Sequence, residues 1–161
     1  MRQLRLLLNE RERSTWRGLL QTYSSIVREL DVQLRVRHDF ALTSYEVLAQ
    51  LYLTPERRLR LTDLADRLVF TRSGVTRVID RLERQGYVAR CGADDDGRGV
   101  FAVLTDSGVD RFDEVRHTFV AVLRERFFDR LREGELEQLD ELWARLRTRP
   151  LPGQGAASPE A

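Results

Sequence analysis

Residues 61–105 read LTDLADRLVFTRSGVTRVIDRLERQGYVARCGADDDGRGVFAVLT and decide the fold. Thr62 stands where the N-cap of a short helix is expected, and Thr71 caps a second helix. The apolar positions of the second helix recur with helical period at Val75, Val78, Ile79 and Leu82. Gly86 ends that helix as a left-handed residue. Two strands of a hairpin follow, Tyr87–Arg90 and Val100–Leu104, so the order predicts a winged helix-turn-helix.

The second helix turns its apolar positions inward, so its polar side chains are expected to face outward. The N-terminal half of such a helix reaches deepest into a DNA major groove. Arg77 carries the forked donors that match a guanine edge, and the amides behind Thr71 favour a phosphate. The predicted DNA-contacting residues of this helix are Thr71, Arg72, Ser73, Thr76, Arg77 and Arg81. As an alternative these are solvated polar positions, and Arg81 and Arg84 lie within helical reach of Asp80 or Glu83.

The hairpin tip, GADDDGRG, places an arginine in an acidic, glycine-rich loop. Arg98 is predicted to enter a narrow minor groove, where the negative potential is enhanced. Asp96 is predicted to pair with an arginine and so to hold the loop in shape as part of the DNA-binding set. The alternative is that the acidic run 94–96 is a solvated turn, because exposed carboxylates would repel phosphate.

Long helices are predicted at both ends of the chain. Asn9 and Glu12 have capping-box spacing at the start of the first, which runs to about Arg37. Its apolar residues follow steps of three and four: Trp16, Leu20, Tyr23, Val27, Leu30 and Leu34. A helix from Thr43 to about Leu53 comes next, before Pro55.

Thr105 is predicted to cap another long helix, and a last helix carries Leu136, Leu139, Trp143 and Leu146. The apolar stripes of the end helices are wider than a small central module can cover, which favours a homodimer. The expected fold is mainly α with a small β wing, set inside a helical dimerisation layer. The expected parts are dimerisation helices in 9–40 and 106–147, a winged helix-turn-helix in 43–105, and a flexible tail in 148–161.

Composition narrows the function classes. All 27 basic residues are arginine and the net charge is only +1, but residues 71–90 hold five arginines against two acids, a local charge of +3. This excess fits phosphate neutralisation and also fits an ordinary solvated helix.

No apolar run approaches the roughly 20 residues that span a bilayer. The run Leu6–Leu8 is too short for a signal peptide, so we expect a cytoplasmic protein with no membrane partner.

Catalytic and metal-binding patterns are absent from the sequence. His38 and His117 have no metal-ligand spacing with each other or with Cys91, the single cysteine. No nucleophile elbow, phosphate loop or H-E-x-x-H motif occurs. We therefore expect no enzyme, no metal and no cofactor, and Cys91 to be a small strand residue rather than a redox switch.

Three segments resemble the MarR family of bacterial transcription regulators: LTDLADRL (61–68), TRSGVTRVIDRLERQGYV (71–88) and DGRGVFAVLTDSG (96–108). The resemblance covers about residues 9–147. It implies an obligate homodimer, a pseudo-palindromic operator in double-stranded DNA, and in many members relief of repression by a small molecule. The family wing commonly reads Asp-Arg-Arg, whereas this chain has Asp96, Gly97 and Arg98. Any role of the middle position is therefore not carried over.

In the family, small aromatic acids often bind where the dimer layer meets the reading head, which is the winged helix-turn-helix. The residues of this chain that could line such a crevice are Trp16, Tyr23, His38, Tyr45 and His117. Alternatively, each of them is an ordinary core or surface residue. The predicted function is a sequence-specific DNA-binding transcriptional regulator, a dimeric repressor relieved by a small phenolic effector. The alternative is a winged-helix dimer that acts as a protein-interaction module without specific DNA reading.

Overall fold

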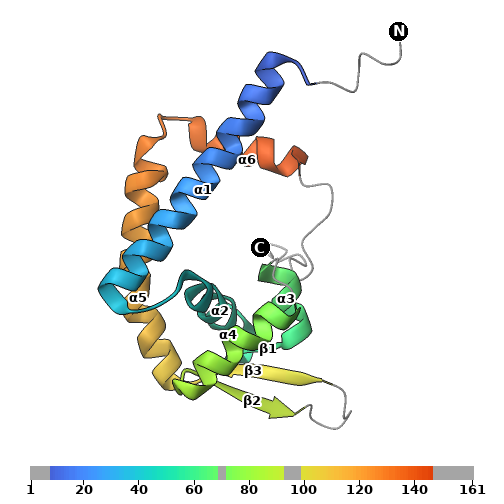
Figure 1. Ribbon diagram of the computed structural model, residues 1–161, viewed down its shortest axis with the longest axis vertical. Helices are drawn as coiled ribbons and strands as arrows, with labels where there is room; N and C mark the ends of the chain where they lie inside the picture. Colours follow the sequence, from blue (N-terminus) through green and yellow to red (C-terminus); the bar gives the residue numbers. More distant parts are fainter. Residues whose placement is uncertain (1–7, 69–71, 93–98, 147–161) are drawn as a thin grey trace, which may run out of the picture.

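The computed structural model describes residues 8–68, 72–92 and 99–146 (Figure 1). Its six α-helices are α1 (Glu10–His38), α2 (Leu42–Tyr52), α3 (Leu61–Leu68), α4 (Arg72–Arg84), α5 (Asp106–Arg126) and α6 (Glu135–Leu146). Its strands are β1 (Arg58–Arg60), β2 (Val88–Gly92) and β3 (Val100–Leu104), and short 3₁₀ turns lie at Pro55–Arg57 and Phe128–Arg130. The predicted class, mainly α with a small β wing, is confirmed.

Helix α1 begins and ends as its sequence dictates. The Asn9 side chain accepts from the Glu12 amide at 2.9 Å and the Glu12 carboxylate accepts from the Asn9 amide at 2.7 Å, which confirms the capping box. Asp39 ends the helix in the left-handed region, with φ 49°, a conformation that Asp tolerates better than most residues. Helix α2 follows within four residues, and the Asp31 carboxylate of α1 accepts from the Leu42 amide at its start, at 2.9 Å.

Helices α1 and α5 run side by side as two long rods, and the compact group of α2, α3, α4 and the sheet gathers at one end of them (Figure 1). Helix α2 lies at the centre of this group, with Val47, Leu48 and Leu51 fully buried. The apolar face predicted for α4 is confirmed at Val75, Ile79 and Leu82, each at most 1% exposed. Burial of one such side chain contributes about 1.5–3 kcal/mol.

The sheet has three antiparallel strands in the order β1-β3-β2, one more than the sequence predicted. Strand β1 is three residues long and pairs with β3, with Arg60 opposite Phe101. Only its middle residue, Leu59, is buried, so the strand has no readable alternation of its own. The expectation of Thr62 as an N-cap is also wrong, because α3 begins at Leu61, directly after β1.

The structure confirms two predicted helix ends beside the wing. Gly86 has φ 77° and ends α4, as expected for a residue without Cβ. The Thr105 hydroxyl accepts from the Gly108 amide at 3.0 Å and caps α5. Among the described residues, no helix is both long enough and apolar enough to cross a membrane.

Candidate nucleic-acid interface

The exposed face of α4 forms the centre of the candidate interface. Ser73, Thr76 and Arg77 are exposed, while Val75 and Ile79 on the opposite side are buried. Arg77 has no ion-pair partner within the described part of the chain. Arg72 is the first residue of α4, and its side chain and Thr71 lie outside what the structure describes. The predicted outward direction of the first turns is therefore confirmed at residues 73, 76 and 77.

Arg81 lies on the same helix but does not share this open position. Its guanidinium donates to the Ser44 hydroxyl at 2.6 Å and to the Thr43 hydroxyl at 3.3 Å, both on α2. Position 81 borders the buried face of α4, so a long side chain there can reach back to the neighbouring helix. These two bonds give Arg81 a role within the protomer, and its contact with DNA stays a prediction.

Arg90 of β2 holds two carboxylates of α4. It donates to Asp80 at 2.5 Å and, through its other terminal nitrogen, to Glu83. The sequence had offered these acids as partners of Arg81 and Arg84. Arg84 instead donates to the Asp80 carbonyl, at 3.3 Å. Strand alternation carries the missed signal, because Arg90 stands two residues from the buried Val88 and thus on the sheet face toward α4.

Strands β2 and β3 carry the wing that starts beside α4. Cys91 pairs with Phe101 across them and is an exposed strand residue. The wing tip, with Asp96 and Arg98, lies outside the described residues, and so do the acidic run 94–96 and the tail 148–161. The minor-groove contact of Arg98 and the structural role of Asp96 consequently stay predictions.

The five residues predicted for an effector crevice do not meet within one protomer. Tyr45 is buried and stacks on Phe119 of α5, with ring centroids 4.2 Å apart, and burial raises the pKa of Tyr45 to about 12. His38 contacts Thr118 of the same helix, Nε2 to Oγ1, at 2.7 Å. His117 and Tyr23 are exposed.

Trp16 is the most distant of the five. It stands 22 residues before His38 on one continuous helix, about 33 Å along the axis. It lines an apolar groove of about 630 Å³ between α1 and α6, together with Leu19, Leu142, Trp143 and Leu146. The predicted set thus divides into two residues beside α5, the buried Tyr45 and the partly buried His38, and three exposed residues on α1 and α5.

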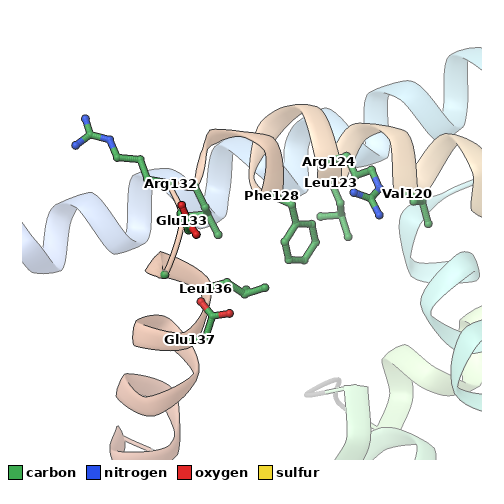
Figure 2. A pocket seen from close by; sticks show the side chains of 10 residues that line it. Val120, Leu123, Arg124, Phe128, Arg132, Glu133, Leu136 and Glu137 are labelled. Atoms are coloured by element: carbon green, nitrogen blue, oxygen red, sulfur yellow. The ribbon is translucent and has the colours of Figure 1, made fainter.

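A second cavity, of about 560 Å³, lies where α5 passes into α6. Figure 2 shows Phe128 and Leu136 directed toward the same hollow from the two sides, with Arg124 and Glu137 at its edge. None of the five predicted effector residues lines it. Across the described residues no group of His, Cys, Asp or Glu is arranged to hold a metal ion.

Helices α3 and α4 followed by the β2–β3 hairpin form a winged helix-turn-helix, which places the chain in the class of winged-helix proteins. A model of the MarR family matches residues 38–99. The chain is 32% identical over 139 residues to YkoM of Bacillus subtilis, an uncharacterized HTH-type transcriptional regulator, covering 84% of this chain and 88% of that protein. The chain therefore belongs to the MarR family of transcription regulators, as its motifs had implied, and the family and these relatives are regulators rather than enzymes.

Solved structures agree with this assignment. Sco3205, a MarR family transcriptional regulator from Streptomyces coelicolor solved in complex with DNA, gives a TM-score of 0.83 at 32% identity, covering 91% of this chain and 95% of that one. AbsC, a MarR family regulator from the same organism, gives 0.80 at 29% identity, covering 89% and 99%. The likeness to these two structures shows that the chain has the MarR-type winged-helix fold.

Proposed function

We propose that the protein is a homodimeric, sequence-specific DNA-binding repressor whose α4 helices read the two halves of a pseudo-palindromic operator. The division of α4 carries this proposal: its first turns expose Ser73, Thr76 and Arg77, while its last turns are bonded to α2 and β2 of the same protomer. A helix anchored at one half can present the other half to a major groove. The DNA complex of Sco3205, a relative at 32% identity, supports the same role.

Exposed apolar side chains on the end helices support the dimer. Trp16 is 56% exposed and Leu20 is 46% exposed on α1, and Leu146 is 58% exposed on α6. The groove between α1 and α6 adds apolar surface beside them. A contiguous apolar surface of this kind marks an interface in a protein. To bind both half-sites, the paired copies must hold their two α4 helices about one DNA turn apart, roughly 34 Å.

Relief of repression by a small phenolic effector completes the proposal. His38 and Tyr45 meet α5 at the corner where the long helices join the reading head. A ligand that wedges this corner open would favour a different α4 spacing and lower affinity by its differential binding to the two states. Titrating phenolic acids into a labelled protein–operator complex should reduce its fluorescence anisotropy. An anisotropy that stays constant for every acid tested removes this part of the proposal.

The first test is DNA binding itself. Footprinting at moderate salt on the DNA upstream of the protein's own gene should show a protected pseudo-palindrome. A protein that protects no sequence, yet captures partner proteins through α4, would instead be the interaction module.

Arg77→Ala tests base reading. Arg77 is exposed on the first turns of α4, so its loss should cost about 1–3 kcal/mol of operator binding and relax selection at one base pair. Measured affinities for an operator series with single base changes check this. The matched control is Arg37→Ala, which removes an exposed arginine of α1 that donates to Gln33. Equal weakening on every sequence would mean that Arg77 contacts only phosphate.

Arg98→Ala tests the minor-groove prediction. Removal of an arginine from a narrow, strongly negative groove should weaken operator binding and reduce the salt slope of log affinity by about one. Affinity measured from low to moderate salt gives both values. Unchanged affinity together with an unchanged slope would reject the contact.

A further inference from the structure

The last turns of α4 are attached to the rest of the protomer in two directions. Asp80 and Glu83 hold Arg90 of β2, which joins α4 to the wing. Arg81 lies between them in the sequence, and its guanidinium donates hydrogen bonds to Ser44 and Thr43 at the N-terminus of α2. The two attachments lead to different elements: the first joins α4 to the wing strand β2, and the second joins α4 to the start of α2, next to the end of α1.

That corner is tightly built. Helix α1 ends at His38 and α2 starts at Leu42, and the N-cap position of α2, Ala41, offers no side-chain cap. Asp31 of α1 supplies the missing acceptor to the Leu42 amide. Burial alone would raise the pKa of Asp31, but hydrogen bonds from the Arg35 side chain and the Leu42 amide hold that pKa below its ordinary value. The start of α2 is thereby fixed to the last turns of α1.

Arg81 forms a polar link from this corner to the recognition helix, α4. Ser44 is 1% exposed, so its hydroxyl is an acceptor inside the protein and is closed to DNA. Arg81 lies four residues, about 6 Å along the helix, from Arg77 at the exposed half of α4. Apolar contacts between α2 and α4 resist separation of the two helices, but a charged hydrogen bond also depends on direction and so fixes rotation.

We propose that Arg81 is a positioning residue that sets the angle of the recognition helix to the α1 frame, and thereby the half-site spacing that the dimer accepts. The inference rests on the proposed function, since it assigns a role within operator binding. It differs from direct readout, in which Arg81 would touch a base or phosphate.

The experiment starts with the wild-type protein and its footprinted operator, rebuilt with the spacing between half-sites changed by one and two base pairs. Arg81→Ala, Ser44→Ala, the double variant and Arg81→Lys are then compared on this series. Thermal unfolding of each variant checks the fold. Arg37→Ala again controls for the loss of one positive charge. Ser44→Ala is the decisive variant, because it disturbs the link without touching the surface that meets DNA.

We expect the operator affinity of the Arg81→Ala and Ser44→Ala variants to depend less on half-site spacing than that of the wild type. Arg81→Ala and Ser44→Ala should each weaken binding at the native spacing by about 5–10-fold, with a smaller loss at altered spacings. The double variant should bind the operator no more weakly than Arg81→Ala, because both substitutions remove the same hydrogen bond between Arg81 and Ser44. Arg81→Lys should recover part of the spacing preference.

Two results would overturn the inference and are distinguishable from failure of the proposed function. Suppose that Ser44→Ala binds every operator as the wild type does, and that Arg81→Ala loses affinity by the same factor at every spacing. Arg81 would then contact DNA directly. Additive losses in the double variant would show that Ser44 and Arg81 act separately. A wild-type protein that protects no sequence is detected before any variant is made, and it would remove the proposed function and this inference with it.

Discussion

Arg90 joins the wing strand β2 to helix α4 through a single side chain. Its guanidinium binds Asp80 and Glu83, whose side chains are 50% and 39% exposed. Ion pairs this open to water are screened and contribute at most about 1 kcal/mol to stability. Their larger effect is geometric, since they fix the base of the wing against α4.

Arg90→Gln should therefore separate stability from binding. We expect less than about 1 kcal/mol of lost stability but a loss of about 1–2 kcal/mol in operator affinity, because the wing is no longer held. A double-mutant cycle with Arg98→Ala measures the coupling. If both act through the wing, the two losses are not additive. Fully additive losses would mean that Arg90 does not position the wing.

The arginines of α4 also show where sequence reasoning stops at this scale. Periodicity predicted the buried positions Val75, Ile79 and Leu82 correctly, because helical spacing is a local property. The partner of Arg81 lies 37 residues away on α2, and that of Asp80 lies 10 residues away across a turn. No local pattern encodes such pairs, so the sequence could not predict the bond from Arg81 to Ser44 or that from Arg90 to Asp80.

At the level of elements, the start of α5 is locked to the end of α4. The Thr105 hydroxyl donates to the Gly86 carbonyl at 2.7 Å, and the Thr105 amide donates to the Tyr87 carbonyl at 3.1 Å. Gly108 packs directly on this turn: a Cβ at position 108 would lie 2.1 Å from the Tyr87 carbonyl oxygen and 2.6 Å from a Leu104 methyl group. The junction thus requires a residue without a side chain.

Gly108→Ala is expected to destabilise the fold by about 2–4 kcal/mol, since a backbone atom cannot move aside as a side chain can. Urea denaturation followed by circular dichroism measures the change. Gly18→Ala is the matched control, because Gly18 lies within α1 with open space around its Cβ position, and there alanine should stabilise by several tenths of a kcal/mol. Equal stability of the Gly108→Ala and wild-type proteins would contradict the close approach.

Elements were predictable in proportion to how local their signals are. The Asn9 capping box, Gly86 and Thr105 each fix an end of a helix, and the structure has all three ends where the sequence placed them. Strand β1 was missed because its three residues are defined by pairing with β3, about 40 residues later. Element ends set by caps are readable, whereas an element created by a distant partner is not.

At the scale of the whole molecule, the apolar surface of the end helices has no partner within the described protomer. Groove residues from both helices remain exposed, among them Trp16 at 56% and Leu142 at 36%. Residues of the same kind in the reading head are buried, such as Leu48 and Leu51. The stripe predicted on α1 therefore belongs to the core only near its end, at Leu30 and Leu34.

The difference between the buried and exposed parts of the end helices predicts which residues hold the proposed dimer together. Trp16→Arg should convert a particle of twice the 18.8 kDa chain mass into a monomer, because a buried aromatic side chain contributes about 2–3 kcal/mol and a charge in its place must be desolvated. Light scattering over a concentration series measures the mass. Leu53→Arg is the control: Leu53 is 76% exposed but lies at the end of α2, so the mass should not change.

Dissociation should also abolish tight operator binding, because each monomer keeps one α4 and loses the second half-site. For two linked contacts the overall affinity exceeds that of either alone by about 10²–10⁴-fold, so Trp16→Arg should bind its operator at least about 100-fold more weakly while α4 itself is unchanged. Half-site DNA separates this from misfolding, since the monomer should bind a single half-site as well as the wild type does. A monomer that still gripped the full operator at wild-type strength would refute the paired arrangement of recognition helices.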